Sequence, residues 1–322
     1  MKVVYAPIFI YYLWLAIKAR SFYFISASNP GIPIGGLLGV SKKLILDKIP
    51  QHLVPRTLFR ESGGDANDFA NSIGDAGIGY PLIAKPDVGE RGFGVEKIND
   101  EKELDNYLRQ YSQDILVQEF VELPIELGVF YYRMPGDESG TISSIVQKDM
   151  MSVSGDGIST VRELMSQSSR AKLQLETFEI DYPDTLDAIP SKGENRILMQ
   201  IGNHCRGTAF LNGNHLINNK LVNVFDSISR RIEGFYYGRF DIKCASIDDL
   251  YEGKFVILEL NGAASEPAHI YHPGFSILEA YKVLFHHWSI VYKISMANKK
   301  QGHKYMPANE FFAALRRSRV MT

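Results

Sequence analysis

The segment FVILELNG at residues 255–262 constrains the fold of this chain more than any other. It begins with an apolar run, and apolar and polar side chains alternate with a period of two from Leu258 to Asn261, which predicts a β-strand. Glu259 and Asn261 then project from the same face of that strand. Small residues, and not large apolar ones, follow Asn261 in the sequence. The strand is therefore expected to present the side-chain oxygens of Glu259 and Asn261 as two ligands at its end.

A second predicted strand, YYGRFDIKCASI at residues 236–247, precedes this one and carries Asp241. Further strands alternate with helical stretches whose first residues are typical caps. Asn99 or Asp100 is expected to cap one helix, and Thr160 and Glu163 have the spacing of a capping box in another. The pattern predicts an α+β fold with mostly antiparallel sheets in several lobes.

A glycine-rich loop, KPDVGERGFGV at residues 85–95, lies between two predicted strands. A dinucleotide-binding fingerprint or a Walker loop must lead into a helix, so both are excluded here. Glycines in a turn between strands can expose backbone N–H groups to an anion, and Lys85 would add a positive charge beside it. An ordinary flexible hairpin with a paired lysine is the alternative interpretation.

Asp241, Glu259 and Asn261 together offer three oxygen ligands on paired strands. Mg²⁺ prefers oxygen ligands and is commonly shared with substrate phosphates. A phosphate loop combined with such a set indicates a nucleoside triphosphate. His269 and His272 fit a zinc site less well, because catalytic zinc normally has three protein ligands and no third nitrogen or sulfur ligand lies nearby in the sequence.

The composition is that of an ordinary globular protein. The 322 residues are 45% hydrophobic and 22% charged, with a net charge of −2. Nucleic acid is not expected as a partner, because its binding depends on clustered lysine and arginine. Cys205 and Cys244 lack CxxC spacing, so a reducing, cytoplasmic compartment is expected, with both thiols buried.

The run at residues 3–17 carries no charge but is shorter than the roughly 20 residues that a spanning helix needs. We interpret it as a buried or interface helix, which a homodimer contact would stabilise. Peripheral contact with a membrane through Tyr11, Tyr12 and Trp14, with Lys18 and Arg20 at the helix end, is the less favoured interpretation.

Five segments, taken in order, resemble the ATP-grasp carboxylate–amine ligases, and most closely members similar to cyanophycin synthetase and D-alanine:D-alanine ligase. They are KPDVGERGFGV, VQEFVELPIE, VSGDGISTVREL, IPSKGENRILMQIGNHCRGTAFLNG and GRFDIK with FVILELNGAASEPAHIYHP. The resemblance implies two α+β lobes that clasp ATP after a shortened N-terminal region. The expected divisions are a reduced segment at 1–60, a small lobe at 61–122 and a large lobe with a C-terminal helix at 123–322.

The resemblance also implies roles for individual residues. Those expected to bind ATP are Lys42 (or Lys43), Lys85, Gly89, Gly92, Gly94, Glu119, Val121 and Glu126. Asp241, Glu259 and Asn261 match the Mg²⁺ ligands. Arg239 and Arg206 match cations that steady the transferring phosphoryl group and the later oxyanion. The segment with His269 lines the acceptor side of the active site in the family, so contact with substrate and a packed turn are both open for His269.

The activity implied is ATP-dependent amide or peptide bond formation between a small carboxylate and an amine through an acyl phosphate. A module that binds ATP without independent turnover, and a small-molecule kinase of the same fold, are the alternatives. The shortened N-terminal region leaves the substrates open, because fuller relatives use that region to contact them.

Overall fold

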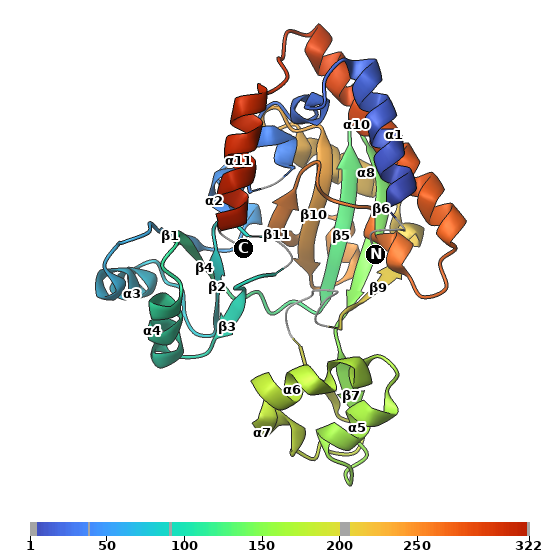
Figure 1. The fold of residues 1–322 in the computed structure, drawn as a ribbon. Helices are drawn as coiled ribbons and strands as arrows, with labels where there is room; N and C mark the ends of the chain where they lie inside the picture. The colour runs from blue at the N-terminus through green and yellow to red at the C-terminus, as the bar shows by residue number, and fades with distance from the viewer. Residues whose placement is uncertain (1–4, 38, 90–91, 200–206, 321–322) are drawn as a thin grey trace. The chain divides into compact units, whose positions relative to one another are not determined.

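The computed structural model describes residues 5–37, 39–89, 92–199 and 207–320. The chain forms two compact units (Figure 1). The larger contains Met1–Val146 and Asn212–Thr322, and the smaller contains Gln147–Leu211. Helices pack on sheets whose described strand pairs are antiparallel, so the predicted α+β class is confirmed. The lobe boundaries at residues 60 and 122 stay predictions.

The first sheet of the larger unit has four strands in the order β1-β4-β2-β3. They are β1 (Thr57–Arg60), β2 (Leu82–Pro86), β3 (Glu96–Ile98) and β4 (Ile115–Glu119). Helices α3 (Ala66–Asp75) and α4 (Glu101–Gln110) bury their apolar stripes against this sheet. Asp100 is the N-cap of α4 and accepts a hydrogen bond from the Glu103 amide at 2.8 Å, as one of the two predicted caps.

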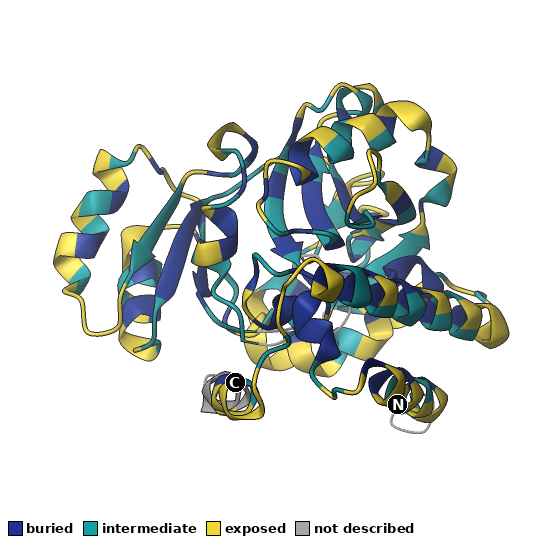
Figure 2. Cartoon of the chain, turned by 90° about the horizontal axis from the view of Figure 1, so that it is seen from above, coloured by how far each residue is buried: buried dark blue, intermediate teal, exposed yellow. Residues whose placement is uncertain are grey.

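The second sheet has five strands in the order β11-β10-β5-β6-β9. They are β5 (Ile125–Tyr132), β6 (Thr141–Asp149), β9 (Ala209–Asn212), β10 (Tyr237–Cys244) and β11 (Phe255–Asn261). Consecutive residues of β5 enter different cores: Val129 packs with α8 (Asn219–Ser229), and Phe130 packs with α10 (Ile277–Lys300). Figure 2 shows these strands mostly buried and the helices exposed on their outward faces. Helices on both faces therefore make this sheet the centre of the unit.

The remaining elements of the larger unit are short helices and the helices near its two ends. They are α1 (Ala6–Ala19), η1 (Phe24–Ala27), η2 (Pro33–Gly36), α2 (Lys42–Leu46), η3 (Gln51–Leu53), η6 (Asn214–Leu216), α9 (Ile247–Tyr251), η7 (Ala268–Tyr271) and α11 (Ala308–Val320). The predicted N-terminal helix is confirmed as α1, which packs on α10. No helix in the described part of the chain is both long enough and apolar enough to cross a membrane.

The smaller unit has a core of its own, formed by Met151, Val161, Met165, Phe178 and their neighbours. Its elements are β7 (Ser152–Ser154), α5 (Val161–Gln167), η4 (Ala171–Gln174), α6 (Leu175–Asp181), α7 (Pro183–Leu186) and β8 (Asn195–Ile197). Strands β7 and β8 pair antiparallel. The predicted capping box of Thr160 and Glu163 is present at the start of α5.

Asn29 ties the segment before α2 to the central sheet. Its side chain is fully buried and makes four hydrogen bonds to backbone groups. The amide nitrogen donates to Gly35 O at 2.9 Å and Tyr237 O at 2.8 Å, and the amide oxygen accepts from the Tyr236 and Tyr237 N–H groups at 2.8 and 2.9 Å. All four hydrogen-bonding positions of this amide are thus used, three of them to hold the start of β10.

We predict that Asn29→Ala lowers the free energy of unfolding by about 3 kcal/mol, because buried backbone groups lose their partners. The measurement is denaturant-induced unfolding, with Asn71→Ala on the exposed side of α3 as the matched control. A loss no larger than that of the control would show that water replaces the amide at no cost.

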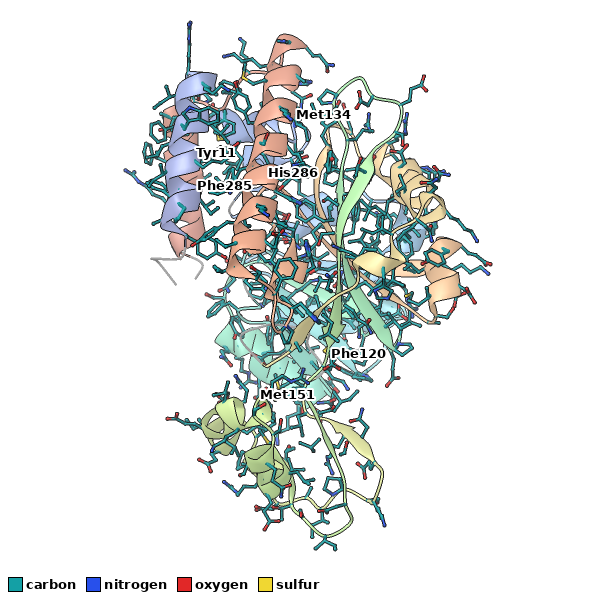
Figure 3. All side chains as sticks on the ribbon, turned by 90° about the vertical axis from the view of Figure 1, so that its right-hand side faces the viewer. Tyr11, Phe120, Met134, Met151, Phe285 and His286 are labelled. Atoms are coloured by element: carbon teal, nitrogen blue, oxygen red, sulfur yellow. The ribbon has the colours of Figure 1, made fainter. Side chains whose placement is uncertain are left out.

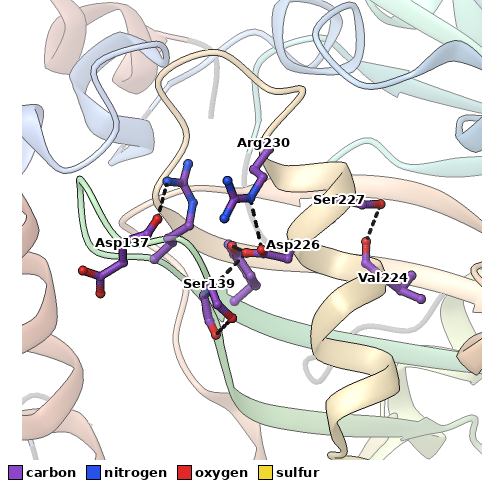
Figure 4. Close-up of polar contacts among 9 residues, drawn as sticks. Asp137, Ser139, Val224, Asp226, Ser227 and Arg230 are labelled. Carbon is purple, nitrogen blue, oxygen red and sulfur yellow. Dashed lines mark hydrogen bonds and ion pairs between the residues drawn. The ribbon is translucent and has the colours of Figure 1, made fainter.

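Asp226 of α8 accepts hydrogen bonds from three donors where β5 ends and β6 begins (Figure 4). Its carboxylate accepts from the Tyr131 hydroxyl, from Gly140 N at 2.9 Å and from Arg230 Nε at 3.1 Å. Burial opposes the charged form, but these hydrogen bonds and the Arg230 charge outweigh it, so the pKa of Asp226 is lowered. A depressed pKa contributes stability above the unfolded pKa of the carboxyl, and that stability disappears as the pH falls through the folded pKa.

We therefore predict that Asp226→Asn destabilises the fold at neutral pH and that its difference from the parent protein shrinks to nothing in acid. Unfolding free energies measured over a pH series test this, with exposed Asp75→Asn as the control. If the difference in unfolding free energy between Asp226→Asn and the parent protein were the same at low pH, the loss of stability would come from the changed shape of the side chain and not from its charge.

Candidate active site

Four polar side chains share one face where β10 and β11 pair. Arg239 lies opposite Asn261, and Asp241 lies opposite Glu259, in an antiparallel register that shifts just after Asp241. Residues two apart on a strand point to the same side, so both pairs face one way. The polar face predicted from the sequence at this strand end is present.

Arg239 and Asp241 form a two-point ion pair on this face. Arg239 Nε and Nη2 lie 2.7 and 3.1 Å from the two Asp241 carboxylate oxygens. Asp241 is only 5% exposed. Burial opposes the charge of Arg239, but the carboxylates of Asp241, Glu259 and Glu266 outweigh it and raise the pKa of the guanidinium. Arg239 therefore stays charged, and this positive group is held beside the candidate metal ligands.

The fit of this face to a metal ion depends on Asp241, Glu259 and Asn261. Among the described residues, no three His, Cys, Asp or Glu side chains come together to hold a metal. Mg²⁺ nonetheless is often bound by one or two carboxylates together with substrate phosphates. The ligand that Asn261 can offer a cation is its amide oxygen, whereas its buried amide nitrogen, which has no hydrogen-bond partner among the described residues, is a donor suited to a phosphate oxygen. The donor set fits a magnesium ion that a phosphate ligand completes.

The residues that follow Asn261 have small side chains because two backbone segments come into contact there. Gly262 packs against Gly35 and Gly36, and a Cβ at Gly262 would lie 2.7 Å from both Gly35 O and Gly36 Cα. Ala263 N and Ala264 N donate to Gly35 O and Gly36 O at 3.0 and 3.1 Å. Gly35 and Gly36, which precede α2, therefore pack directly against the end of β11, and larger side chains at these positions would push the two segments apart.

Lys85 of β2 enters the same region from the other sheet. Its side chain is 7% exposed, and its ammonium donates to Gln118 Oε1 at 2.6 Å. Burial lowers the pKa of Lys85 to about 8, Glu259 and Asp87 act in the opposite direction, and Lys42 adds to the lowering. The charge of Glu259 on β11 therefore acts on the pKa of Lys85 on β2, in opposition to burial.

The glycine-rich loop connects β2 to β3, which pair antiparallel as the sequence predicts. Gly92 and Gly94 adopt positive φ angles of 74° and 64°. At Gly94 a Cβ would lie 2.8 Å from Pro86 Cγ, and its carbonyl accepts from the Tyr107 hydroxyl at 2.7 Å. The backbone at the end of this hairpin is thus held in a turn that few other residues could adopt.

Lys42, rather than Lys43, reaches this hairpin. Lys42 Nζ donates to the carbonyls of Pro86, Asp87 and Gly89 at 3.0, 3.2 and 3.1 Å. Lys43 instead forms an exposed pair with Asp47. The structure therefore places the first of the two candidate lysines at the loop.

Asp87 is a site residue that the sequence analysis missed. It is 3% exposed, and its carboxylate accepts from the Lys43 N–H at 2.8 Å while its carbonyl accepts from the Lys42 N–H at 3.0 Å. It fixes α2 against the end of β2 and so positions Lys42. The sequence signal was its place directly after KP at the strand end, in front of the loop glycines.

The linker after β4 is held by cations. Glu119 forms a two-point pair with Arg56 at 2.9 and 3.0 Å, and Val121 O accepts from Lys243 Nζ at 3.0 Å. The same lysine lies 4.0 Å from the buried carboxylate of Glu126. Predicted residues Glu119, Val121 and Glu126 therefore lie along one segment, and Lys243, which the sequence analysis did not select, links two of them.

His269 and His272 occupy structural positions. His269 is buried, and its Nδ1 lies 2.6 Å from the Ser144 hydroxyl, while His272 Nδ1 accepts from Asn212 N at 3.2 Å. Burial lowers the pKa of His269. Of the two interpretations left open for His269, these contacts favour the packed turn. The predicted catalytic residue Arg206 lies outside the described residues.

A polar cluster beside Arg239 also escaped the sequence analysis. Arg239 Nη1 donates to Glu266 O at 3.4 Å, and the Glu266 carboxylate accepts from the hydroxyls of Tyr5 and Tyr271. Tyr5 precedes α1, so the N-terminal segment reaches this side of the site. No sequence periodicity connects residues so far apart in the chain.

Comparison with known proteins gives partial matches. No model of a protein family matches the chain. Formate-dependent phosphoribosylglycinamide formyltransferases of Sulfolobus acidocaldarius and Sulfurisphaera tokodaii are each 32% identical over 76 residues, which cover 21% of this chain and 19% of each relative. The match thus spans about a fifth of the length of these curated relatives.

Solved structures that resemble the chain include ligases. A D-alanine–D-alanine ligase from Bacillus anthracis has a TM-score of 0.44 at 12% identity, covering 81% of this chain and 69% of that one. The VanG D-Ala:D-Ser ligase from Enterococcus faecalis has a TM-score of 0.43 at 14% identity, covering 77% and 61%. A bifunctional glutathione synthetase from Pasteurella multocida has a TM-score of 0.37 at 15% identity, covering 76% and 35%.

Proposed function

We propose that this chain is an ATP-dependent ligase that joins a small carboxylate to an amine through an acyl phosphate. One arrangement carries the proposal: the carboxylates of Asp241 and Glu259 share one face of the β10–β11 pair, and Lys85 is buried at the end of β2 where the glycine loop begins. The charge of Glu259 raises the pKa of Lys85 against the effect of burial. Cations from one sheet and carboxylates from the other are the two halves of a site for a metal-bound triphosphate. The motifs named above support the same assignment.

In this proposal the triphosphate lies between the β2–β3 hairpin and the β10–β11 face. Lys85 would bind phosphate oxygens, and the backbone N–H groups of the loop with Gly89, Gly92 and Gly94 would close over them. Lys42 now donates to three carbonyls of that loop, so it would either hold the loop or turn to the phosphates. The linker at Glu119 and Val121 would receive the adenine, and Glu126 the ribose hydroxyls.

Mg²⁺ would be held by Asp241, Glu259 and Asn261, and when bound it neutralises phosphate charge. Arg239 has a separate task in the proposal. It is fixed by Asp241 and stays cationic, so it can stabilise negative charge on the phosphoryl group and on the later tetrahedral oxyanion without moving. Arg206 is proposed as a second cation.

The proposed chemistry has two steps. A carboxylate oxygen of the substrate attacks the γ-phosphorus of ATP, a P–O bond forms, and the bond to ADP breaks. The amine then attacks the acyl carbon, a C–N bond forms, phosphate leaves with the original carboxylate oxygen, and the amine loses a proton. No protein nucleophile takes part, so catalysis depends on positioning and on fixed cations.

We predict that Glu259→Gln lowers Mg²⁺-dependent turnover by about a hundredfold or more while the chain stays folded, because the change removes charge and keeps shape. The assay is ADP and phosphate release from ATP with amino acids and dipeptides as carboxylates and amines, with products identified by mass spectrometry. Cooperative unfolding of the variant confirms the fold.

Glu252→Gln is the matched control, because Glu252 is exposed and pairs only with neighbouring Lys254 among the contacts described. Its turnover is expected to equal that of the parent protein. Full activity in Glu259→Gln would contradict the assignment of the carboxylate face. A stable phosphorylated product in place of an amide would identify a kinase.

A further inference from the structure

Helix α1 is apolar on both of its sides although it lies on the surface of the larger unit. One side is buried, through Leu15, Ala16 and Ala19, in the cluster that includes α10. The opposite side exposes Phe9, Ile10 and Ile17, which are 60%, 68% and 74% exposed. A helix that is hydrophobic all round is normally covered on all sides. The outer side of α1 is therefore an apolar face without a cover among the described residues.

Aromatic and basic side chains border this face. Trp14 is 49% exposed and stacks on Tyr11 at 5.5 Å between ring centroids, and Tyr11 meets Phe285 of α10 edge-on at 5.0 Å. Figure 3 shows Tyr11 and Phe285 where the two helices meet. Lys18 Nζ lies 4.3 Å from the centre of the Trp14 ring. Tryptophan and lysine at the edge of an apolar surface are typical of membrane–water interfaces.

The half-buried position of Tyr11 changes the interpretation made from the sequence. Tyr11 and Tyr12 pack toward α10 and η1, where Tyr12 contacts Trp288 and Phe24. The exposed apolar groups are instead Phe9, Ile10 and Ile17. The two tyrosines are too buried to form a membrane contact by themselves. The exposed side chains of Phe9, Ile10 and Ile17 provide an apolar surface for such a contact instead.

Charge is distributed very unevenly between this region and the rest of the chain. Residues 5–37 and 275–302, which include α1 and α10, contain six lysines and arginines and one acidic residue. The rest of the chain contains 29 basic and 36 acidic residues, so the net charge of −2 conceals a local charge of +5. Exposed side chains of α10 contribute through Lys293 and Lys300, and through Lys282, which also pairs with Glu279. The region that includes α1 is thus positive on a protein that is otherwise negative.

We propose that the exposed face of α1 docks on the surface of an anionic lipid bilayer, with the helix lying in the headgroup region. Aliphatic side chains would enter the acyl boundary, Trp14 would lie at headgroup depth, and the surrounding cations would meet acidic lipids. This surface lies outside the proposed ATP site and does not depend on the proposed reaction.

Charge argues against the other occupants of this face. A symmetric dimer would place the same patch against itself, so the positive borders of both copies would meet and repel. A nucleic acid would satisfy the cations but would leave Ile10 and Ile17 in water. A bilayer with acidic headgroups satisfies both the apolar and the charged groups.

The test is co-sedimentation of the full chain with phosphatidylcholine vesicles, with and without phosphatidylserine. We expect about tenfold tighter partitioning onto the anionic vesicles, and we expect added salt to reduce that preference. The double variant Ile10→Asp/Ile17→Asp should reduce anionic binding by about tenfold or more. Both residues are exposed, so the variant should unfold at the same denaturant concentration as the parent protein.

The matched control is Ile158→Asp/Ile180→Asp in the smaller unit, where the two side chains are 81% and 74% exposed. It introduces the same charge and should leave vesicle binding unchanged. Equal loss in both double variants, or no loss in Ile10→Asp/Ile17→Asp, would overturn the proposal. So would a failure to bind vesicles together with a dimer that the Ile10→Asp/Ile17→Asp variant dissociates, because that result identifies a second copy as the occupant.

Discussion

The arrangement of the larger unit depends on a buried group of charges in which each member needs the others. Lys85 and Asp241 are almost completely inaccessible to water, and an isolated charge in such a position is strongly unfavourable. Asp241 is compensated by Arg239, and Lys85 by Gln118 and the charge of Glu259. The four-stranded and five-stranded sheets therefore stabilise each other's polar residues. Burial outweighs this compensation and lowers the pKa of Lys85 to about 8, and an anion bound beside the ammonium would favour its charged form.

A second constraint comes from the glycines before α2. Gly35 and Gly36 pass so close to Gly262 that side chains on either segment would collide. The same segment is anchored to β10 by the four hydrogen bonds of Asn29 and leads into α2, whose Lys42 reaches the loop after β2. The segment at residues 29–42 thus contacts both the β10–β11 face and the glycine loop after β2, and it holds the two parts of the candidate site in position.

Local patterns predicted those parts of the molecule that depend on neighbours in the chain. Alternation predicted β11 and the shared face of Glu259 and Asn261, and cap spacing predicted the starts of α4 and α5. Strand–turn–strand glycines predicted the β2–β3 hairpin. The assignment of Lys85, Lys42 and the carboxylates to one site came from family resemblance.

What the sequence did not reveal depends on contacts between distant segments. The position of Asp87 under Lys42, the bridge from Lys243 to Val121, and the cluster of Tyr5, Glu266 and Tyr271 each join residues from different elements. The exposed side of α1 was also hidden, because a uniformly apolar helix does not indicate which side is packed. Only the position of α10 determines that Ile10 and Ile17 face outward.

The central claim is that a substrate carboxylate is activated by phosphoryl transfer between the two sheets. It is tested most directly by supplying the carboxylate labelled with ¹⁸O and determining by mass spectrometry which product carries the label. The account predicts that one labelled oxygen appears in the released phosphate and that the other remains in the amide. Label in AMP, or both labelled oxygens in a stable phosphorylated product, would contradict it.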